Sequence, residues 1–384
     1  MNREAARALV LIAAAVVLSM TTWFSASAVL PQLREEWAIG ETGAAWLTIA
    51  VQLGFVAGAL ASSLLNVADV GAARHLIAAG SAGAAAANLG LLAADGPELA
   101  IPLRFATGFC LAAVYPPALK LMATWFQRGR GTALGVLVGA LTLGSAAPHL
   151  VNGLGGAEWR VVVVATSALT AAGGALVLAA VRDGPFPFPR ATLDPRQAGR
   201  VFRNRGVRLA SLGYFGHMWE LYAMWAWFVV FAGTLWDATE AAYATFAVIA
   251  AGTVGCVAAG AVADRLGRAE TTVACMAVSG ACAVAIGLVP AALVLPVGLA
   301  WGLAVVADSA QFSTLVTEHA DQAYVGTALT LQLAVGFTLT VATIWIVPYA
   351  VDAVGWRWAF ALLAFGPALG IAAMLRLRRP AAAA

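Results

Sequence analysis

Twelve apolar runs along the chain are each long enough to cross a lipid bilayer as a helix. A hydrocarbon core about 30 Å thick requires about 20 helical residues. Inside that core every backbone polar group must be bonded within the protein, so we expect these runs to be helices. The predicted spans lie at approximately 8–31, 43–66, 75–93, 99–124, 131–152, 160–181, 209–232, 242–263, 271–289, 292–315, 326–349 and 356–376. The sequence therefore predicts an all-α polytopic membrane protein.

The composition favours the same class of protein. Of the 384 residues, 62% are hydrophobic and 11% are charged, whereas soluble domains have about 25% charged residues. The four cysteines fall in apolar runs at no metal-ligand spacing. The sequence has no nucleotide-binding motif and no nucleophile in a pattern with a catalytic base. We therefore expect no metal, no cofactor and no enzymatic activity.

Basic residues gather on one side of the predicted spans. Seventeen arginines fall on the side of the termini and of the central linker, and three fall on the other side: Arg34, Arg160 and Arg357. Loops rich in Lys and Arg stay in the cytoplasm. We expect both termini to be cytoplasmic and the protein to lie in a bacterial inner membrane. The linker arginines suit topology and anionic headgroups better than nucleic acid.

The two halves of the chain resemble each other. A proline-rich linker at 182–208 separates residues 1–181 from residues 209–384. The sequence GTAL at 131–134 recurs at 326–329, and the Trp-Arg pair at 159–160 recurs at 356–357. A parallel repeat of this kind predicts two pseudo-symmetric six-helix bundles with a substrate site between them.

The segment GAVADRLGR, residues 260–268, ends the eighth span. Asp264 can face the positive N-terminus of another helix, and Gly267 permits a tight turn. Arg265 and Arg268 are expected in the headgroup layer. The equivalent loop of the first half contains Asp69 without this spacing of arginine and glycine.

This segment closely resembles the loop signature of the major facilitator superfamily. The resemblance implies the twelve-helix fold, transport by alternating access, and a latch between Asp264 and the start of span five, near Gly131 and Thr132. LRFATGFCLAA, with Arg104, is similar to a second motif of the superfamily, in which Arg104 would take part in proton transfer. WFQRGRGTALG is similar to the loop of its organic-anion and nitrate-porter-like branches.

Span seven contains a titratable pair, His217 and Glu220, near its middle. Residues three apart share one helical face, so the pair is expected to point together into a cavity between the halves. Ionisable residues within a membrane mark functional sites by default. We expect a proton site, and a structural pair is the alternative. Asp308 in span ten is a third candidate, with His217, a basic residue or a cationic substrate as its partner, and local hydrogen bonding near the cytoplasmic end is the alternative.

Other polar side chains in the spans have two open interpretations. Lys120 either attracts an anionic substrate or reaches to the cytoplasmic surface, and Arg104 either transfers protons or lies at the periplasmic interface. His149, near the end of span five, is expected to be structural. Candidates for substrate binding besides Lys120 are Tyr115, Trp23, Thr22, Gln52, Trp227, Gln311 and Gln332.

These features predict a proton-coupled secondary transporter, with a small organic or inorganic anion as the favoured substrate. The alternative within this class is a proton-driven exporter of hydrophobic or cationic compounds. A non-transporting membrane sensor is a remote alternative. The expected partners are a small-molecule substrate, protons and the lipid bilayer, and we expect a monomer.

Overall fold

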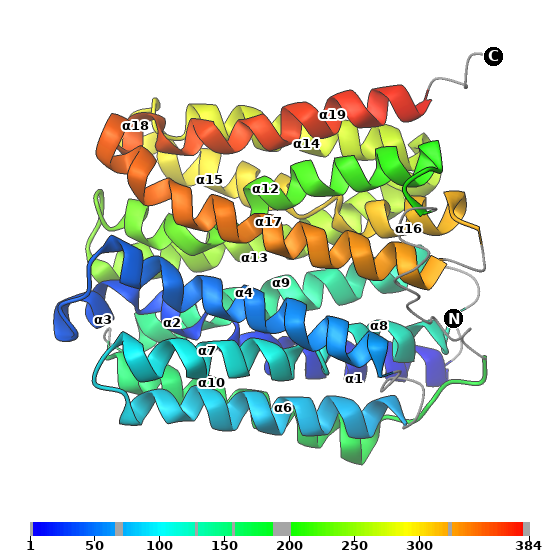
Figure 1. The fold of residues 1–384 in the computed structure, drawn as a ribbon, viewed down its shortest axis with the longest axis horizontal. Coiled ribbons are helices and arrows are strands. Elements are labelled where there is room, and N and C mark those ends of the chain that lie inside the picture. The colour runs from blue at the N-terminus through cyan, green and yellow to red at the C-terminus, as the bar shows by residue number, and fades with distance from the viewer. Residues whose placement is uncertain are drawn as a thin grey trace.

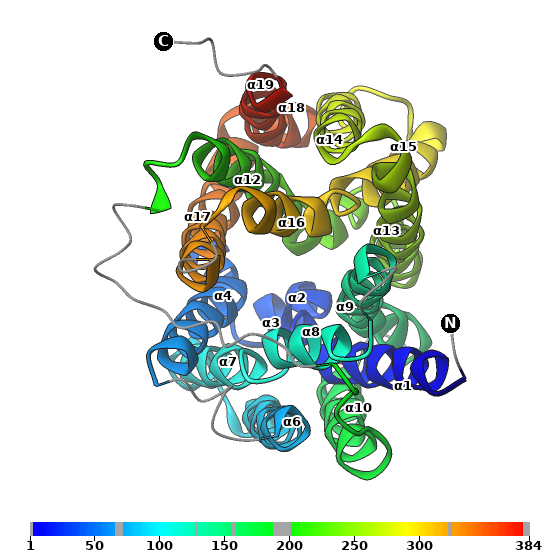
Figure 2. The same cartoon turned by 90° about the vertical axis from the view of Figure 1, so that its right-hand side faces the viewer.

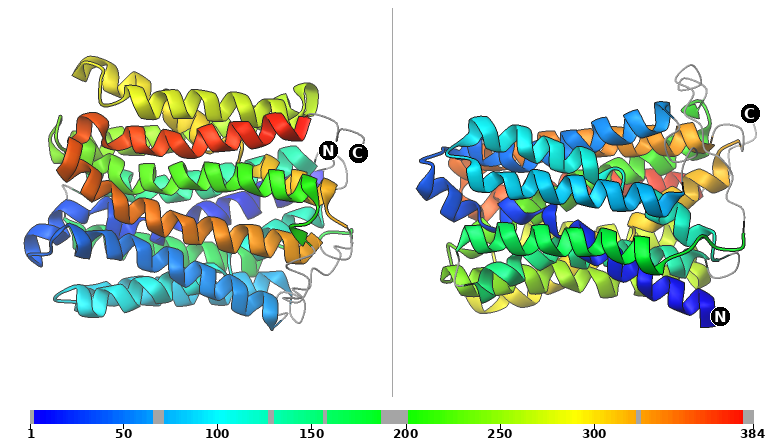
Figure 3. Two further views of the ribbon diagram at one scale, coloured as in Figure 1. Left: turned by 45° about the horizontal axis from the view of Figure 1, so that its top comes forward. Right: turned by 90° about the horizontal axis from the view of Figure 1, so that it is seen from below.

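The computed structural model describes residues 3–65, 72–126, 130–155, 158–186, 201–321 and 325–378. Long helices run side by side between the same two ends of the molecule (Figures 1 and 3). The helices of the N-terminal half are α1 (Arg3–Ser19), η1 (Met20–Thr22), α2 (Ser25–Ala28), α3 (Leu30–Glu36), α4 (Glu41–Leu64), α6 (Ala73–Leu89), η2 (Gly90–Ala93), α7 (Pro97–Leu111), α8 (Tyr115–Ala123), α9 (Arg130–Leu154) and α10 (Trp159–Ala180).

The C-terminal half repeats this plan. Its helices are α12 (Arg205–Ala232), α13 (Ala238–Leu266), α14 (Arg268–Ala285), α15 (Ala291–Val305), α16 (Ser309–His319), α17 (Val325–Val354), α18 (Trp356–Ala359), η4 (Phe360–Ala364) and α19 (Phe365–Arg378). Helix α12 begins at Arg205, four residues before the predicted start at 209. Helix α1 begins and α19 ends at the same end of the bundle (Figure 1).

Each of the twelve predicted spans is helical. Within the described residues, ten helical segments are long and apolar enough to cross a membrane. The two predicted spans outside that set are α12, which carries His217 and Glu220, and α14, whose first turn carries Arg268 and Glu270. These polar residues lower the apolar character of both helices without preventing helix formation.

The two halves meet chiefly along two helix pairs. Viewed along the helices, α9 lies beside α13 and α4 lies beside α17 (Figure 2). Glycine allows the first pair to approach closely, because a Cβ added at Gly139 would lie 3.2 Å from the backbone oxygen of Thr253. The hydroxyl of Thr253 donates a hydrogen bond of 3.0 Å to the carbonyl of Gly139. Small residues serve helix contacts in membranes in this way.

Reciprocal glycines also bring two helices together inside each half. A Cβ at Gly108 of α7 would collide with the backbone oxygen of Val51 on α4. In the second half, a Cβ at Gly302 of α15 would collide with the backbone oxygen of Val248 on α13. The pseudo-symmetry of the sequence therefore extends to the packing of spans two and four, and of spans eight and ten.

The fourth helix of each half is interrupted at a corresponding point. Helix α7 ends at Leu111 and α8 begins at Tyr115, and α15 ends at Val305 and α16 begins at Ser309. Pro116 and Pro117 follow the first interruption, and neither has an N–H for the bond to the preceding turn. Span ten is interrupted in the same way, although no proline follows its interruption. Discontinuous helices are where membrane transporters place their binding sites.

Candidate functional site

A buried ion pair lies at the interruption of span ten. The Nδ1 atom of His217 is 2.9 Å from Oδ1 of Asp308, and both side chains are 1% exposed. The His217 ring packs against the rings of Phe312 and Tyr214. Of the three partners considered for Asp308, His217 is the one that the fold places beside it.

Asp308 owes this contact to its place in the chain. It precedes the first residue of α16, where an aspartate commonly accepts a hydrogen bond from the helix N-terminus. Here its side chain makes no such capping bond and is turned toward His217 on α12. Within the described residues, both carboxylate oxygens of Asp308 and Nε2 of His217 have no hydrogen-bond partner, so the 2.9 Å approach is a charge contact and not a hydrogen bond. The pair therefore keeps polar atoms for a proton or a ligand.

Glu220 has different partners from His217, which corrects the expectation of a joint face toward the middle of the molecule. Its Oε1 accepts 2.7 Å from the indole N–H of Trp301 on α15, and its Oε2 accepts 2.8 Å from the hydroxyl of Ser279 on α14. Both helices belong to the C-terminal half. Residues three apart differ by about 60° around a helix, so Glu220 meets α14 and α15, while His217 meets Asp308 at the interruption before α16. Glu220 points into the second bundle and not between the bundles.

Arg104 lies inside the N-terminal bundle and not at a membrane interface. Its guanidinium is fully buried. It donates to the backbone oxygens of Leu47, at 3.3 Å, and Thr22, at 2.9 Å, and also to that of Trp23. These carbonyls of Thr22 and Trp23 belong to the interruption in span one, between η1 and α2, so Arg104 holds this irregular backbone together.

Asn88 of α6 completes this polar centre. Its Oδ1 accepts 2.5 Å from Ser25 and 3.1 Å from Arg104, and its Nδ2 donates 2.9 Å to Ser167 of α10. A network in which each member has partners makes a bundle rigid. Asn88, Ser279 and Trp301 are not among the site residues that the sequence predicts. A polar residue in an apolar run was the one signal that could have indicated Asn88.

An aromatic cluster joins the two halves. The ring of Trp23 lies 4.8 Å from that of Phe55, 5.9 Å from that of Tyr222 and 5.8 Å from that of Phe337. Phe24 contacts the ring of Tyr222 at 6.1 Å and that of Trp225 at 5.8 Å. Trp23, predicted to bind substrate, is thus placed where the first half meets α12 and α17.

Several buried polar atoms on the helices of this cluster have no hydrogen-bond partner within the described part of the chain. They are Nε1 of Trp23, both amide atoms of Gln52, Nε1 of Trp225 and Nε2 of Gln332. Buried polar groups are almost always paired, so each unpaired one calls for an explanation. Uncommitted polar atoms beside aromatic rings are suited to hold a ligand. Gln52 and Gln332 were both expected to bind substrate.

The remaining residues predicted to bind substrate lie away from the aromatic cluster or have polar atoms that already form hydrogen bonds. The indole N–H of Trp227 donates 2.9 Å to the carbonyl of Ile344, so this polar atom is used for packing against α17. Thr22 is buried and its carbonyl accepts from Arg104. Tyr115 and Lys120 are half-buried on α8, directly after the interruption of span four.

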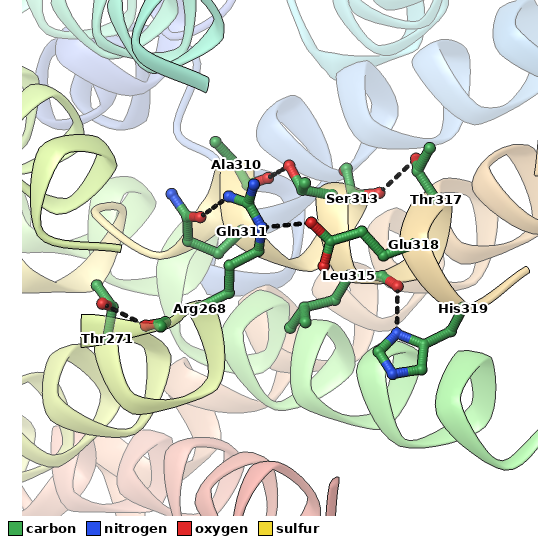
Figure 4. A network of polar contacts seen from close by, with 11 residues as sticks. Arg268, Thr271, Ala310, Gln311, Ser313, Leu315, Thr317, Glu318 and His319 are labelled. Carbon is green, nitrogen blue, oxygen red and sulfur yellow. Dashed lines mark hydrogen bonds and ion pairs between the residues drawn. The ribbon is translucent and has the colours of Figure 1, made fainter. Parts of the chain in front are cut away.

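Gln311 is part of a network at the end of the molecule where the termini lie, and not of the central region. Its Oε1 accepts 2.9 Å from Arg268, whose Nε donates 2.8 Å to Glu318 (Figure 4). Arg268 is half-buried there and joins α14 to α16. Residues of α16 carry the carboxylate and amide oxygens within reach of its guanidinium.

The expected latch has the predicted neighbours. A Cβ added at Gly131 of α9 would lie 3.7 Å from Oδ1 of Asp264. Gly267 ends α13 with a φ of +101°, a conformation that favours glycine. Arg265 is exposed. Asp69, the acid of the equivalent loop, lies outside the described residues.

One family model matches this chain, and no curated protein matches it. The match covers residues 12–340, from the first span into α17. It includes both interrupted helices, the aromatic cluster and the buried ion pair, and it spans most of the 384 residues. The chain belongs to the Major Facilitator Superfamily.

Proposed function

We propose that this membrane transporter couples the movement of its solute to protons through His217 and Asp308. Membership of the superfamily makes the protein a secondary transporter of a solute. The observation that carries the proposal is the 2.9 Å contact between two titratable side chains that are each 1% exposed. Ionisable groups at this depth form proton relays in pumps and transporters.

The position of the pair suggests how a proton acts on the fold. Asp308 lies between α15 and α16, and its attraction to His217 joins this interruption to α12. A proton on the carboxylate removes that attraction and frees α16 to move relative to α12. Glu220, bound by two neutral donors, is a second proton acceptor in the same bundle.

The substrate we propose is a small anion. Of the polar atoms without partners around the aromatic cluster, the indole nitrogens of Trp23 and Trp225 and the amide nitrogen of Gln332 are donors. Donors in a buried, aromatic setting favour a solute that offers acceptor oxygens. Lys120, half-buried at the cytoplasmic half of span four, supports the same charge preference.

Export of hydrophobic or cationic compounds is the second candidate. Two observations favour it: the six aromatic rings of the cluster, which attract cations through their faces, and the two buried carboxylates of Glu220 and Asp308. For cellular location we propose a bacterial inner membrane with cytoplasmic termini, which the arginine distribution supports, and we propose a monomer.

The coupling is tested by flux in proteoliposomes with an imposed pH gradient. We expect Asp308→Asn to abolish gradient-driven accumulation while leaving exchange of labelled against unlabelled solute, because exchange needs no net proton movement. We expect Glu220→Gln to reduce accumulation. Asp237→Asn is the matched control: Asp237 caps α13 at the surface, and asparagine caps as well. Full accumulation by Asp308→Asn would show that the pair does not carry the proton.

A further inference from the structure

Helix α9 carries a buried polar stripe that the proposed proton pathway does not use. Thr142, Ser145, His149 and Asn152 are spaced by three, four and three residues, and each is at most 2% exposed. Within the described residues, Oγ of Ser145 and both ring nitrogens of His149 have no hydrogen-bond partner. A histidine with no exposed surface and no partner at either nitrogen is poorly explained as a structural residue, since its polar atoms are buried without compensation.

The stripe lies at the junction of the two halves. At one end, Nδ2 of Asn152 donates 2.8 Å to the carbonyl of Ala28 on α2, in the first half. At the other end, a Cβ added at Gly252 of α13, in the second half, would lie 3.1 Å from the methyl group of Thr142. His149 stands between these contacts, on a different face of α9 from the partly exposed Leu143 and Leu150.

Two hydrogen bonds fix the depth of His149 relative to Gln52. The hydroxyls of Ser27 and Thr48 are 2.7 Å apart and join α2 to α4, while Asn152 joins the next residue of α2 to α9. Gln52 is four residues after Thr48, and His149 is three residues before Asn152. Because α4 and α9 run in opposite directions, both side chains lie about one turn closer to the end with the termini.

Trp23 and Phe24 lie at this same level, because they precede Ser27 and Ala28 by about one turn on the chain from α1. Phe24 contacts the ring of Trp225, which brings a second uncommitted indole N–H from the other half. Helix α2 packs against α4, α9 and α12. Among the described residues, four buried side chains with unpaired polar atoms thus lie in one layer: Trp23, Gln52, His149 and Trp225.

We propose that this layer is a carboxylate-binding subsite, in which His149 and Gln52 hold the charged end of an organic anion between the indole N–H groups of Trp23 and Trp225. The inference rests on the proposed function and names the part of the site that recognises substrate. An indole nitrogen only donates, a glutamine amide offers two donors, and histidine donates at one nitrogen or at both. A carboxylate accepts at two oxygens and satisfies these donors together. The neighbouring rings of Phe55, Tyr222 and Phe337 face the apolar body.

The subsite is distinct from the proton pair. Trp225 follows His217 by eight residues on α12, which places the two about 12 Å apart along the helix. His217 is paired with Asp308, while His149 has no such partner among the described residues. Binding and proton transfer are therefore separable by mutation.

Equilibrium binding to the purified full-length protein in detergent tests the subsite, with benzoate, its neutral analogue benzamide, and benzyltrimethylammonium as probes. We expect benzoate to bind best of the three probes. We expect His149→Phe to raise the Kd for benzoate at least about 10-fold, which is the change that a lost charge-assisted hydrogen bond produces. His149→Gln, which keeps a donor, should recover part of the affinity. Trp225→Phe should weaken binding, whereas Trp227→Phe should not, because the Trp227 N–H is already bound to Ile344.

The binding results test the subsite, and they do not depend on whether transport is coupled to protons. Unchanged benzoate affinity in properly folded His149→Phe and His149→Gln overturns the role of His149, even where gradient-driven flux remains. Tighter binding of benzyltrimethylammonium, or no binding of benzoate to the wild-type protein, overturns the carboxylate class. Loss of benzoate binding in His149→Phe, with wild-type affinity in Asp308→Asn, supports a subsite apart from the proton pair. Failure of gradient-driven flux in the wild type would instead refute the coupling proposal.

Discussion

At the scale of single residues, the environment of a charged side chain decides its role. Arg104 and Glu220 are both buried charges in apolar spans, but Arg104 is held by three backbone carbonyls and two side-chain oxygens. Glu220 has two neutral donors. A guanidinium stays charged at every physiological pH, so Arg104 can hold these backbone carbonyls, while Glu220, with its two neutral donors, is a group that we propose exchanges a proton.

Because Arg104 bonds to backbone carbonyls of two helices, its replacement is expected to lower the stability of the protein. Arg104→Met leaves several buried acceptors without donors and should lower the free energy of unfolding by roughly 3 kcal/mol or more. Arg104→Lys should recover little, because an ammonium lacks the planar fork. Thermal unfolding in detergent measures both variants. Arg160→Met, at an exposed arginine paired with Glu36, is the control and should change stability much less. A stable Arg104→Met protein that has lost only pH-driven transport would restore the proton-transfer interpretation.

At the scale of helices, close backbone contact is repeated in both halves. Spans two and four meet at Gly108, and spans eight and ten meet at Gly302. Spans four and ten are also interrupted. The glycine contacts lie before each interruption, so they hold α7 and α15 in place, whereas α8 and α16 follow the interruption and lack these contacts. Movement is therefore expected to concentrate in α8 and α16.

The glycine contacts predict matched effects of two substitutions. Gly108→Ala and Gly302→Ala each place a methyl group against a backbone carbonyl that cannot move aside, and each should destabilise the protein by about 1–3 kcal/mol. Gly40→Ala is the control, because no atom lies within 4 Å of the added Cβ. Denaturation midpoints of the three variants provide the comparison. Equal midpoints for Gly302→Ala and Gly40→Ala would contradict the packing described here.

At the scale of the whole molecule, the asymmetry of charge predicts sidedness. Asp95, between η2 and α7, and Asp321, after α16, are both exposed and lie at opposite ends of the helices. In a background without the native cysteines, we expect a membrane-impermeant maleimide added to intact cells to label Asp95→Cys and to leave Asp321→Cys unlabelled. Lysed cells should show labelling of both. Labelling of Asp321→Cys alone in intact cells would reverse the orientation.

The sequence predicted the helices better than the contacts between their side chains. The twelve spans, the glycine turn at Gly267 and the neighbours of Asp264 agree with the structure, because apolar length and turn chemistry are local properties. The direction of Glu220, the burial of Arg104 and the pairing of Gln311 with Arg268 differed from expectation. Each of these depends on which helix lies alongside, and helical periodicity does not contain that information.

The sequence by itself determined that this chain is a helical membrane protein with two related halves, because a bilayer permits few structures and each span must satisfy its own backbone. The tertiary structure decided which polar groups are satisfied and which are left without partners. It paired His217 with Asp308, a residue 91 positions away (308 − 217). It engaged the polar atoms of Arg104 and Trp227 in hydrogen bonds, and it left those of His149, Gln52 and Trp225 without partners among the residues that the structure describes. Such differences arise from the side-by-side placement of helices that are distant in sequence.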